Sequence, residues 1–280
     1  MKKFIALAIL LMIIGAGGMA AQKFAFGDEL PSYHKKWTFS AGELKELVIN
    51  SSSASIEAEF IQSQDGSNYV ELSGNLNQNV INKLDQVSVS GGRFKLDLQN
   101  DSEFRFFNVN FQSTQQHMIV ALSDPAELAK LEATVDSSDV EFKGAQADQI
   151  NISGSSGVIK LSSVKAKKLQ ASVESGIIKA ERVQADVVLS AESGNLELDH
   201  WVGNGSLKTE SGSIRIQDQK ATQLDLEAES GTIEVEANPD FKGFYDAQAE
   251  SGVVKVPDSP RTTTDVIKAR VESGLISIHD

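Results

Sequence analysis

Cysteine is absent from this chain of 280 residues. Its absence excludes a disulfide framework, a thiolate zinc site, a cysteine nucleophile and a lipid anchor attached to cysteine. Basic residues are in the minority, since 26 Lys and Arg stand against 39 Asp and Glu and give a formal net charge of −13. Phosphate binding needs a basic surface, so the charge balance argues against a nucleic-acid partner.

Aromatic residues are also scarce, at 6% of the chain, and only 5 residues are proline. Hydrophobic residues nevertheless make up 40% and charged residues 23%, which is typical of a folded chain rather than a disordered one. Composition therefore bounds the class of protein without indicating an activity.

The first 21 residues have the character of a membrane-targeting segment. Lys2 and Lys3 precede an uncharged, apolar run from Phe4 to Ala21, which would span about 27 Å of a hydrocarbon core roughly 30 Å thick. Two interpretations stay open: an uncleaved signal anchor, or a signal peptide cleaved after the small residues of 18–20. Both place the remaining chain outside the cytoplasm of a bacterium, because the two lysines stay inside.

Residues 22–40 are predicted to be a linker. Their aromatic and basic side chains allow a second interpretation, in which they lie at the level of the lipid headgroups. The side chains concerned are Tyr33, Lys35, Lys36 and Trp37.

Seven Ser-Gly pairs in the C-terminal half recur at nearly constant spacing, with glycine steps of 19, 18, 18, 19, 21 and 22 residues. Such a period indicates a repeat architecture. Glycine suits a turn position with positive φ, so we interpret these residues as structural turns. The turn glycines are Gly157, Gly176, Gly194, Gly212, Gly231, Gly252 and Gly274.

The sequence around each glycine alternates between apolar and polar residues. Ile178, Lys179 and Ala180 follow one turn, and the alternating run 169–173 precedes it. This alternation predicts two half-buried strands per unit, joined by a Glu-Ser-Gly turn. One unit cannot bury its apolar face alone, so residues 131–280 are predicted to form a parallel β-solenoid with coils of 18–22 residues. A narrow core of aliphatic side chains would explain the few aromatic residues.

The last two repeats are longer because 238–239 and 257–260 insert proline-containing loops. Four side chains there are candidates for ligand contact, with ordinary loop packing as the alternative: Phe241, Phe244, Tyr245 and Arg261. The chain ends at Asp280, six residues after the last turn glycine. An exposed final coil would be a strand-pairing hazard, so we expect either an end-to-end contact or a frayed last coil.

Residues 41–130 lack the period but are predicted to be a β-rich cap that extends the sheets of the solenoid. We expect strands at 47–49, 55–60, 69–72, 87–89, 94–98 and 117–122, and one helical turn within 124–130. A cluster of phenylalanines is interpreted as cap core, with an exposed binding patch as the alternative. The cluster consists of Phe104, Phe106, Phe107 and Phe111.

The run Leu47–Ser51 and repeats such as 169–178 resemble the bacterial DUF4097 family of β-strand-repeat proteins, over roughly residues 41–280. That family usually has Gly-Asp or Gly-Ser at the turn, whereas this chain has varied residues after the glycine. The resemblance implies a β-solenoid at the bacterial surface, often described as an adhesin. Some relatives are linked to cell-envelope stress responses, and the resemblance implies no catalytic residues.

A glutamate precedes six of the seven Ser-Gly pairs. In stacked coils these carboxylates would lie about 4.8 Å apart and repel one another. Weak divalent-cation binding is one hypothesis, and a solvated polar turn is the simpler one. The column consists of Glu174, Glu192, Glu210, Glu229, Glu250 and Glu272.

The sequence predicts no catalytic residue, cofactor or resident metal. Its four histidines are scattered, and the periodic serines argue against a single nucleophile. We therefore predict a non-catalytic, adhesin-like interaction protein of the bacterial envelope, with an unidentified protein or glycan partner. The alternative is a membrane-anchored component of an envelope stress response. A carbohydrate-active enzyme is a third hypothesis, which short coils disfavour because they cannot wall a cleft.

Overall fold

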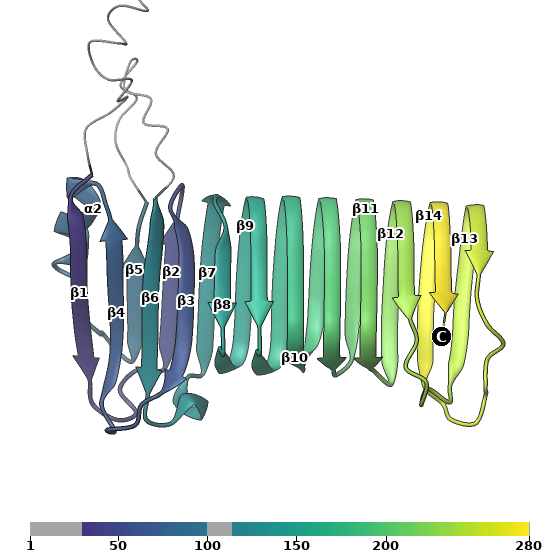
Figure 1. Cartoon of the computed structure of the whole chain (residues 1–280), viewed down its shortest axis with the longest axis horizontal. Coiled ribbons are helices and arrows are strands. Elements are labelled where there is room, and N and C mark those ends of the chain that lie inside the picture. The colour runs from purple at the N-terminus through teal and green to yellow at the C-terminus, as the bar shows by residue number, and fades with distance from the viewer. Residues whose placement is uncertain (1–29, 100–113, 280) are drawn as a thin grey trace, which may run out of the picture.

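The structure is a computed structural model that describes residues 30–99 and 114–279. Its strands form one large, mostly parallel sheet that folds into two layers, and successive repeats stand side by side in a row (Figure 1). The predicted membrane segment 1–21 and the phenylalanines of 104–111 lie outside the described residues. Within the described part, no helix has the length and apolar character needed to cross a membrane.

The repeats form long bent strands: β9 (Gln146–Ser162), β10 (Lys165–Val202), β11 (Gly205–Lys220) and β12 (Gln223–Glu236). Each pairs in parallel with the next, so that equivalent residues are neighbours, as in Leu189, Leu207 and Leu226. The arm before each Ser-Gly pair lies in one layer and the arm after it lies in the other. This pairing confirms the strand-turn-strand unit predicted from the alternation.

The turn glycines are required by the close approach of consecutive repeats. An added Cβ at Gly212 would lie 1.9 Å from the carbonyl oxygen of Gly194, and one at Gly231 would lie 1.8 Å from that of Gly212. No side chain fits at such a distance from a neighbouring backbone. Steric exclusion therefore explains the period of the glycines.

The core between the two layers is filled by the apolar positions of the alternation. Ile178, Leu196 and Ile214 are fully buried. Trp201 is a bulky exception, and its indole Nε1 donates a hydrogen bond of 2.9 Å to the Ala185 carbonyl oxygen. The core therefore remains mostly aliphatic, in line with the low aromatic content.

The last two repeats, β13 (Phe244–Lys255) and β14 (Val266–His279), do not follow the chain order. β14 pairs with β12 on one side and with β13 on the other, so the spatial order is β12, β14, β13. The steps of 21 and 22 residues are therefore not simple loop insertions. The first loop carries the chain past the position beside β12 to form β13, and the second loop brings it back to form β14 in that position. The expectation of an exposed final coil was wrong, because β14 lies inside the stack and β13 forms its end (Figure 1).

The N-terminal part extends both layers, as predicted. One layer continues from the repeats through β7 (Lys130–Ser137) and β2 (Glu46–Ser51) to β5 (Arg93–Asp97). The other continues through β8 (Val140–Lys143), β3 (Ser55–Gln62), β6 (Gln115–Leu122) and β4 (Asn68–Asn75) to β1 (Ser32–Phe39). β4 pairs antiparallel with both of its neighbours, unlike the repeats.

Two elements here differ from the prediction. The strand expected at 87–89 is absent, whereas helix α2 (Gln78–Leu84) precedes that position and was not predicted. Its Val80, Ile81 and Leu84 are buried, and Asn77 caps it by accepting a hydrogen bond from Asn79 N. The expected helical turn is present as the short 3₁₀ helix η1 (Pro125–Glu127).

The range 22–40, predicted to be a linker, contains strand β1. Tyr33 and Trp37 are buried in the core, and the Trp37 ring meets Phe94 edge-on with centroids 5.3 Å apart. These aromatic side chains therefore serve packing rather than a headgroup interface. Lys35 Nζ donates to the Leu84 carbonyl oxygen over 3.0 Å, which ties the strand to the end of α2.

Candidate functional site

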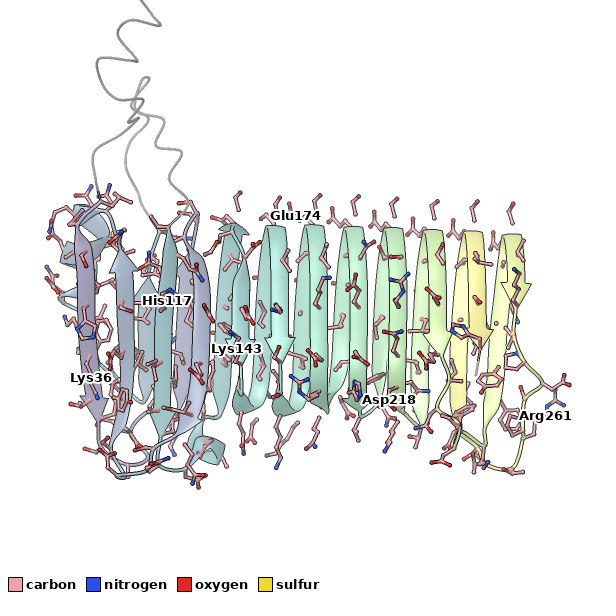
Figure 2. All side chains as sticks on the ribbon, in the orientation of Figure 1. Lys36, His117, Lys143, Glu174, Asp218 and Arg261 are labelled. Atoms are coloured by element: carbon pink, nitrogen blue, oxygen red, sulfur yellow. The ribbon has the colours of Figure 1, made fainter. Side chains whose placement is uncertain are left out.

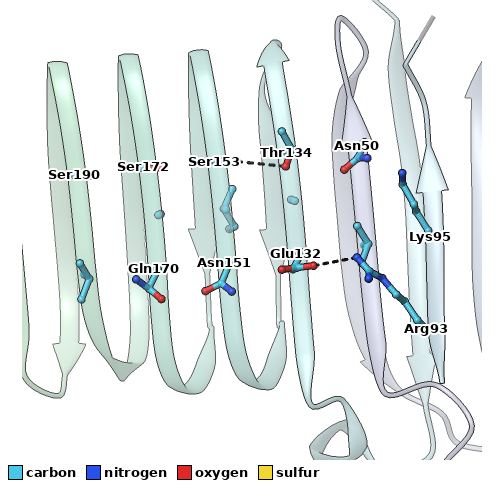
Figure 3. A pocket seen from close by; sticks show the side chains of 15 residues that line it. Asn50, Arg93, Lys95, Glu132, Thr134, Asn151, Ser153, Gln170, Ser172 and Ser190 are labelled. Atoms are coloured by element: carbon cyan, nitrogen blue, oxygen red, sulfur yellow. Dashed lines mark hydrogen bonds and ion pairs between the residues drawn. The ribbon is translucent and has the colours of Figure 1, made fainter. Parts of the chain in front are cut away.

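The outer surface of the layer that contains β5, β2, β7 and the first arms of the repeats carries two adjoining grooves. Their volumes are about 490 Å³ and 430 Å³. They share a column of small hydroxyl side chains, one from each of four successive repeats (Figure 3). We call both grooves together the trough, and its floor column consists of Thr134, Ser153, Ser172 and Ser190.

Strand register produces this column. Thr134 pairs with Ser153, and Ser153 pairs with Ser172. Ser153 Oγ donates to Thr134 Oγ1 over 3.4 Å. Because these side chains are short and the neighbouring columns are longer, the surface is hollowed along the stack direction.

The row of longer side chains along one side of the floor carries two uncharged amides in its middle and the exposed, apolar Val188 beside Ser190. Asn151 and Gln170 point outward there (Figure 3). Amide groups both donate and accept hydrogen bonds, as hydroxyl groups do. The centre of the trough therefore offers hydrogen bonds without a net charge.

Charged residues at the β5 end of the trough neutralise one another. Arg93 Nη2 lies 3.5 Å from Glu132 Oε2 (Figure 3). Lys130 Nζ lies 2.6 Å from Glu132 Oε1. The side chains are partly exposed, so these ion pairs contribute little to stability. The charges at this end balance once Glu46, 3.8 Å from Arg93, and Asp97, 3.9 Å from Lys95, are included.

The trough stops where long side chains replace the hydroxyl groups. Ser190 pairs with Lys208, and Lys208 pairs with Glu227 in the next repeat. Lys208 Nζ lies 3.2 Å from Glu227 Oε1, and this hydrogen bond raises the pKa of Lys208 above its usual value. A charged pair thus closes the floor column toward the C-terminal end.

The glutamate column lies along the Ser-Gly edge of the stack, opposite the edge that carries Asp218 (Figure 2). Glu174, Glu192 and Glu210 form the acidic side of the trough. Register places the last two members in the order Glu272, Glu250, because β14 precedes β13 in space. In the described part of the chain, no three His, Asp or Glu side chains gather closely enough to hold a metal ion.

The four candidate ligand residues near the C-terminal end do not converge on one site. Phe241 is buried and packs on Tyr245 with ring centroids 5.0 Å apart. Phe244 is exposed, and Arg261 projects from the outer loop (Figure 2). None of the four lines the trough.

The histidines are dispersed over four strands, at His34, His117, His200 and His279. His200 Nδ1 lies 2.7 Å from Asp199 Oδ1 on an exposed corner. Neither groove of the trough is lined by a histidine. The trough therefore lacks the usual general base of a serine nucleophile.

The trough was not predicted, although a signal was present in the sequence. The hydroxyl residue stands four positions before the turn glycine in three consecutive repeats, at Ser153, Ser172 and Ser190. At the same position, the next repeat has Lys208. The spacing gives the extent of the hydroxyl column, but the hollow itself depends on strand register and on the longer side chains beside the column.

The sequence matches the family described as Toastrack DUF4097 over residues 44–279. The chain belongs to this family. A comparison with curated proteins gave no match. The DUF4097 resemblance of the repeats is thus confirmed over most of the chain.

Two solved structures show the same fold. A proposed lipid-binding protein from Parabacteroides distasonis is 20% identical, with a TM-score of 0.56, and the match covers 89% of this chain and 97% of that one. A proposed adhesin from the same species is 16% identical, with a TM-score of 0.54 and coverages of 90% and 98%. At such low identity the likeness concerns the fold alone.

Proposed function

We propose that this DUF4097 protein is a non-catalytic interaction protein of the bacterial cell envelope, adhesin-like, which binds a glycan in the trough. Its parallel, in-register repeats support a β-solenoid as the scaffold. The observation that carries the proposal is the uncharged floor of hydroxyl groups that runs across four repeats, with the amide groups of Asn151 and Gln170 beside it.

The shape of the trough favours a polymer over a small molecule. Small-molecule sites are concave pockets that enclose most of the ligand, whereas the trough is an open groove along the stack. Repeat proteins commonly use such extended surfaces for binding. An extended chain with hydroxyl groups at regular intervals would find a hydroxyl group on the floor of each successive repeat, about 4.8 Å apart.

The charge of the trough favours a neutral ligand. An anionic polymer would meet the carboxylates of Glu174, Glu192 and Glu210 along one side. A lipid chain would leave the floor hydroxyl groups without hydrogen-bond partners, which costs free energy. The polar, uncharged floor therefore supports a neutral glycan better than an acidic glycan or a lipid tail.

The test is a glycan-binding screen with the full chain and two arginine variants. Ser172→Arg fills the floor and is expected to weaken binding by about tenfold or more. Gln217→Arg, exposed on the opposite layer, is the matched control and should bind as the parent does. Equal binding by all three proteins would exclude the trough as the site.

The same preparation distinguishes the regulatory alternative. If no glycan binds and a membrane-bound sensor co-purifies with the full chain, the envelope-stress role is favoured instead. Turnover of a bound glycan, detected as shortened products, would contradict the non-catalytic proposal.

A further inference from the structure

The β13 end of the stack exposes an unusual amount of apolar surface. Among the described residues, six large hydrophobic side chains are exposed, and three of them lie on this one strand. Phe244 is 38%, Val253 is 53% and Val254 is 41% exposed. β13 pairs with β14 and with no other strand of the described chain.

The exposure arises because the core is open at this end. Val254 is in register with Ile276 of β14, and Ile276 is 0% exposed. Ala247 and Ala249 are likewise only half-buried, whereas their register partners on β14, Ala269 and Val271, are buried. Val254, Ala247 and Ala249 thus occupy core-facing positions, but no further repeat in the described part of the chain covers them.

A loop closes only the beginning of this edge. Ser259 Oγ accepts a hydrogen bond of 2.9 Å from Tyr245 N, and Arg261 N donates to the Gly243 carbonyl oxygen over 3.0 Å. Beyond Tyr245 the strand continues through residues 246–255. We call this segment the open edge.

The charges of the open edge balance, in spite of the acidic character of the whole chain. Asp246 Oδ2 is held by Arg270 Nη2 at 2.5 Å. The two remaining charged residues are Glu250 and Lys255, which carry opposite charges. A second copy of the open edge would therefore meet no net repulsion.

The opposite end of the stack does not offer a matching edge. There β1 carries Lys35 and Lys36, and lysines on an edge strand hinder pairing with another chain. Helix α2 packs beside the last strands at that end (Figure 1). Head-to-tail pairing is thus disfavoured, which leaves pairing between two identical open edges.

We propose that two copies of this protein associate through their open edges. Identical edges related by a twofold axis run antiparallel. The contact would cover Val254 and the half-buried alanines, and it would satisfy the backbone groups of the edge strand. This interface lies beyond Lys208 and Glu227, so it leaves the trough free.

The first test measures the mass of the full chain in mild detergent by sedimentation equilibrium, at up to about 100 μM. We expect a dimer, and we expect Val254→Lys to weaken the association by about tenfold or more. Val202→Lys changes a side chain of similar exposure (47%) away from this end and should leave the dimer intact. A monomer at every concentration, or equal loss in both variants, would overturn the proposal.

The second test uses the absence of cysteine, so that any thiol cross-link reports an introduced residue. Val253→Cys on the open edge should give a covalent dimer with a short bis-maleimide. Ser213→Cys occupies the equivalent position of an interior repeat, by register through Thr232 and Leu275, and should not. Circular dichroism is used to check that both variants are folded. If they are, the absence of a cross-linked dimer with Val253→Cys would contradict the proposed interface.

Discussion

The two ends of the stack are closed in different ways. At the N-terminal end, antiparallel strands, helix α2 and the lysines of β1 cover the core and blunt the sheet edge. At the other end the chain turns back, inserts β14 into the stack and leaves β13 outermost. Stacked repeats always expose two terminal surfaces, and terminal repeats are usually atypical for that reason. Here the N-terminal end is covered by dedicated capping elements, whereas the outermost strand at the other end, β13, has the sequence pattern of an interior repeat.

The largest expected effect contrasts a turn glycine inside the stack with one at the open end. Gly212→Ala places a Cβ against the Gly194 carbonyl oxygen and should lower the free energy of unfolding by about 4 kcal/mol or more. Gly252→Ala places a Cβ against the Gly274 carbonyl oxygen in the same way. Because only the terminal strand β13 has to move away from β14, we expect the free energy of unfolding to fall by about 2 kcal/mol or less. Urea denaturation of the full chain measures both. Equal losses of stability in the two variants would show that β13 contributes as much to the stability of the stack as an interior repeat does.

A second pair of variants tests the spatial order of the last repeats. Ile276→Ala removes a fully buried side chain and should cost about 2–5 kcal/mol of stability. Val254→Ala, at the register partner, should cost under about 1 kcal/mol in the monomer, because that position is already exposed. The measurement is urea denaturation at a concentration below that of self-association. The reverse ranking would place β13 inside and β14 outside.

The capped end should respond to high pH. Burial, together with the nearby Asp85 carboxylate, raises the pKa of Tyr33 above the usual tyrosine value. Its contribution to stability is complete below the unfolded pKa near 10 and is lost as the pH rises toward the higher folded pKa. Midpoints of urea denaturation should therefore fall above about pH 10, and Tyr33→Phe should reduce that fall. An identical pH profile for the variant would contradict this role of Tyr33.

The smallest expected effect concerns the ion pair between the two outermost repeats. Asp246→Asn removes the charge that Arg270 neutralises and should lower stability by under about 1 kcal/mol, because both side chains are partly exposed. It also leaves a net positive open edge, so self-association should weaken about threefold. Urea denaturation and sedimentation equilibrium measure the two effects. Unchanged association would show that charge balance at the open edge is unimportant.

Much of the fold followed from local patterns. The period of the turn glycines, from Gly157 onward, predicted the stacking of repeats, and the alternation around each glycine predicted which side chains are buried. In the N-terminal part, short apolar runs predicted β2, β3, β4, β5 and β6. Helix α2 was missed because its three buried residues, in a helix of only seven, give too short a pattern.

The candidate site was not predicted, for a different reason. Hydroxyl groups at Ser153, Ser172 and Ser190 carry no signal of their own in strands that alternate polar and apolar residues. They form a floor only because register places them beside one another and because longer side chains flank them. The candidate loop residues Phe241 and Tyr245 had distinctive side chains, yet they pack on each other and on the hydrophobic core.

The sequence alone determined the repeating unit, because glycine exclusion and strand alternation act within a few residues of one another. It also determined the acidic surface, which depends only on composition. Tertiary structure decided the spatial order of β14 and β13. The two repeats have nearly the same pattern of apolar and polar residues, so local sequence does not indicate which of them lies next to β12. It also decided that β1 belongs to the core and that four small side chains form one trough, because both depend on contacts between residues distant in the chain.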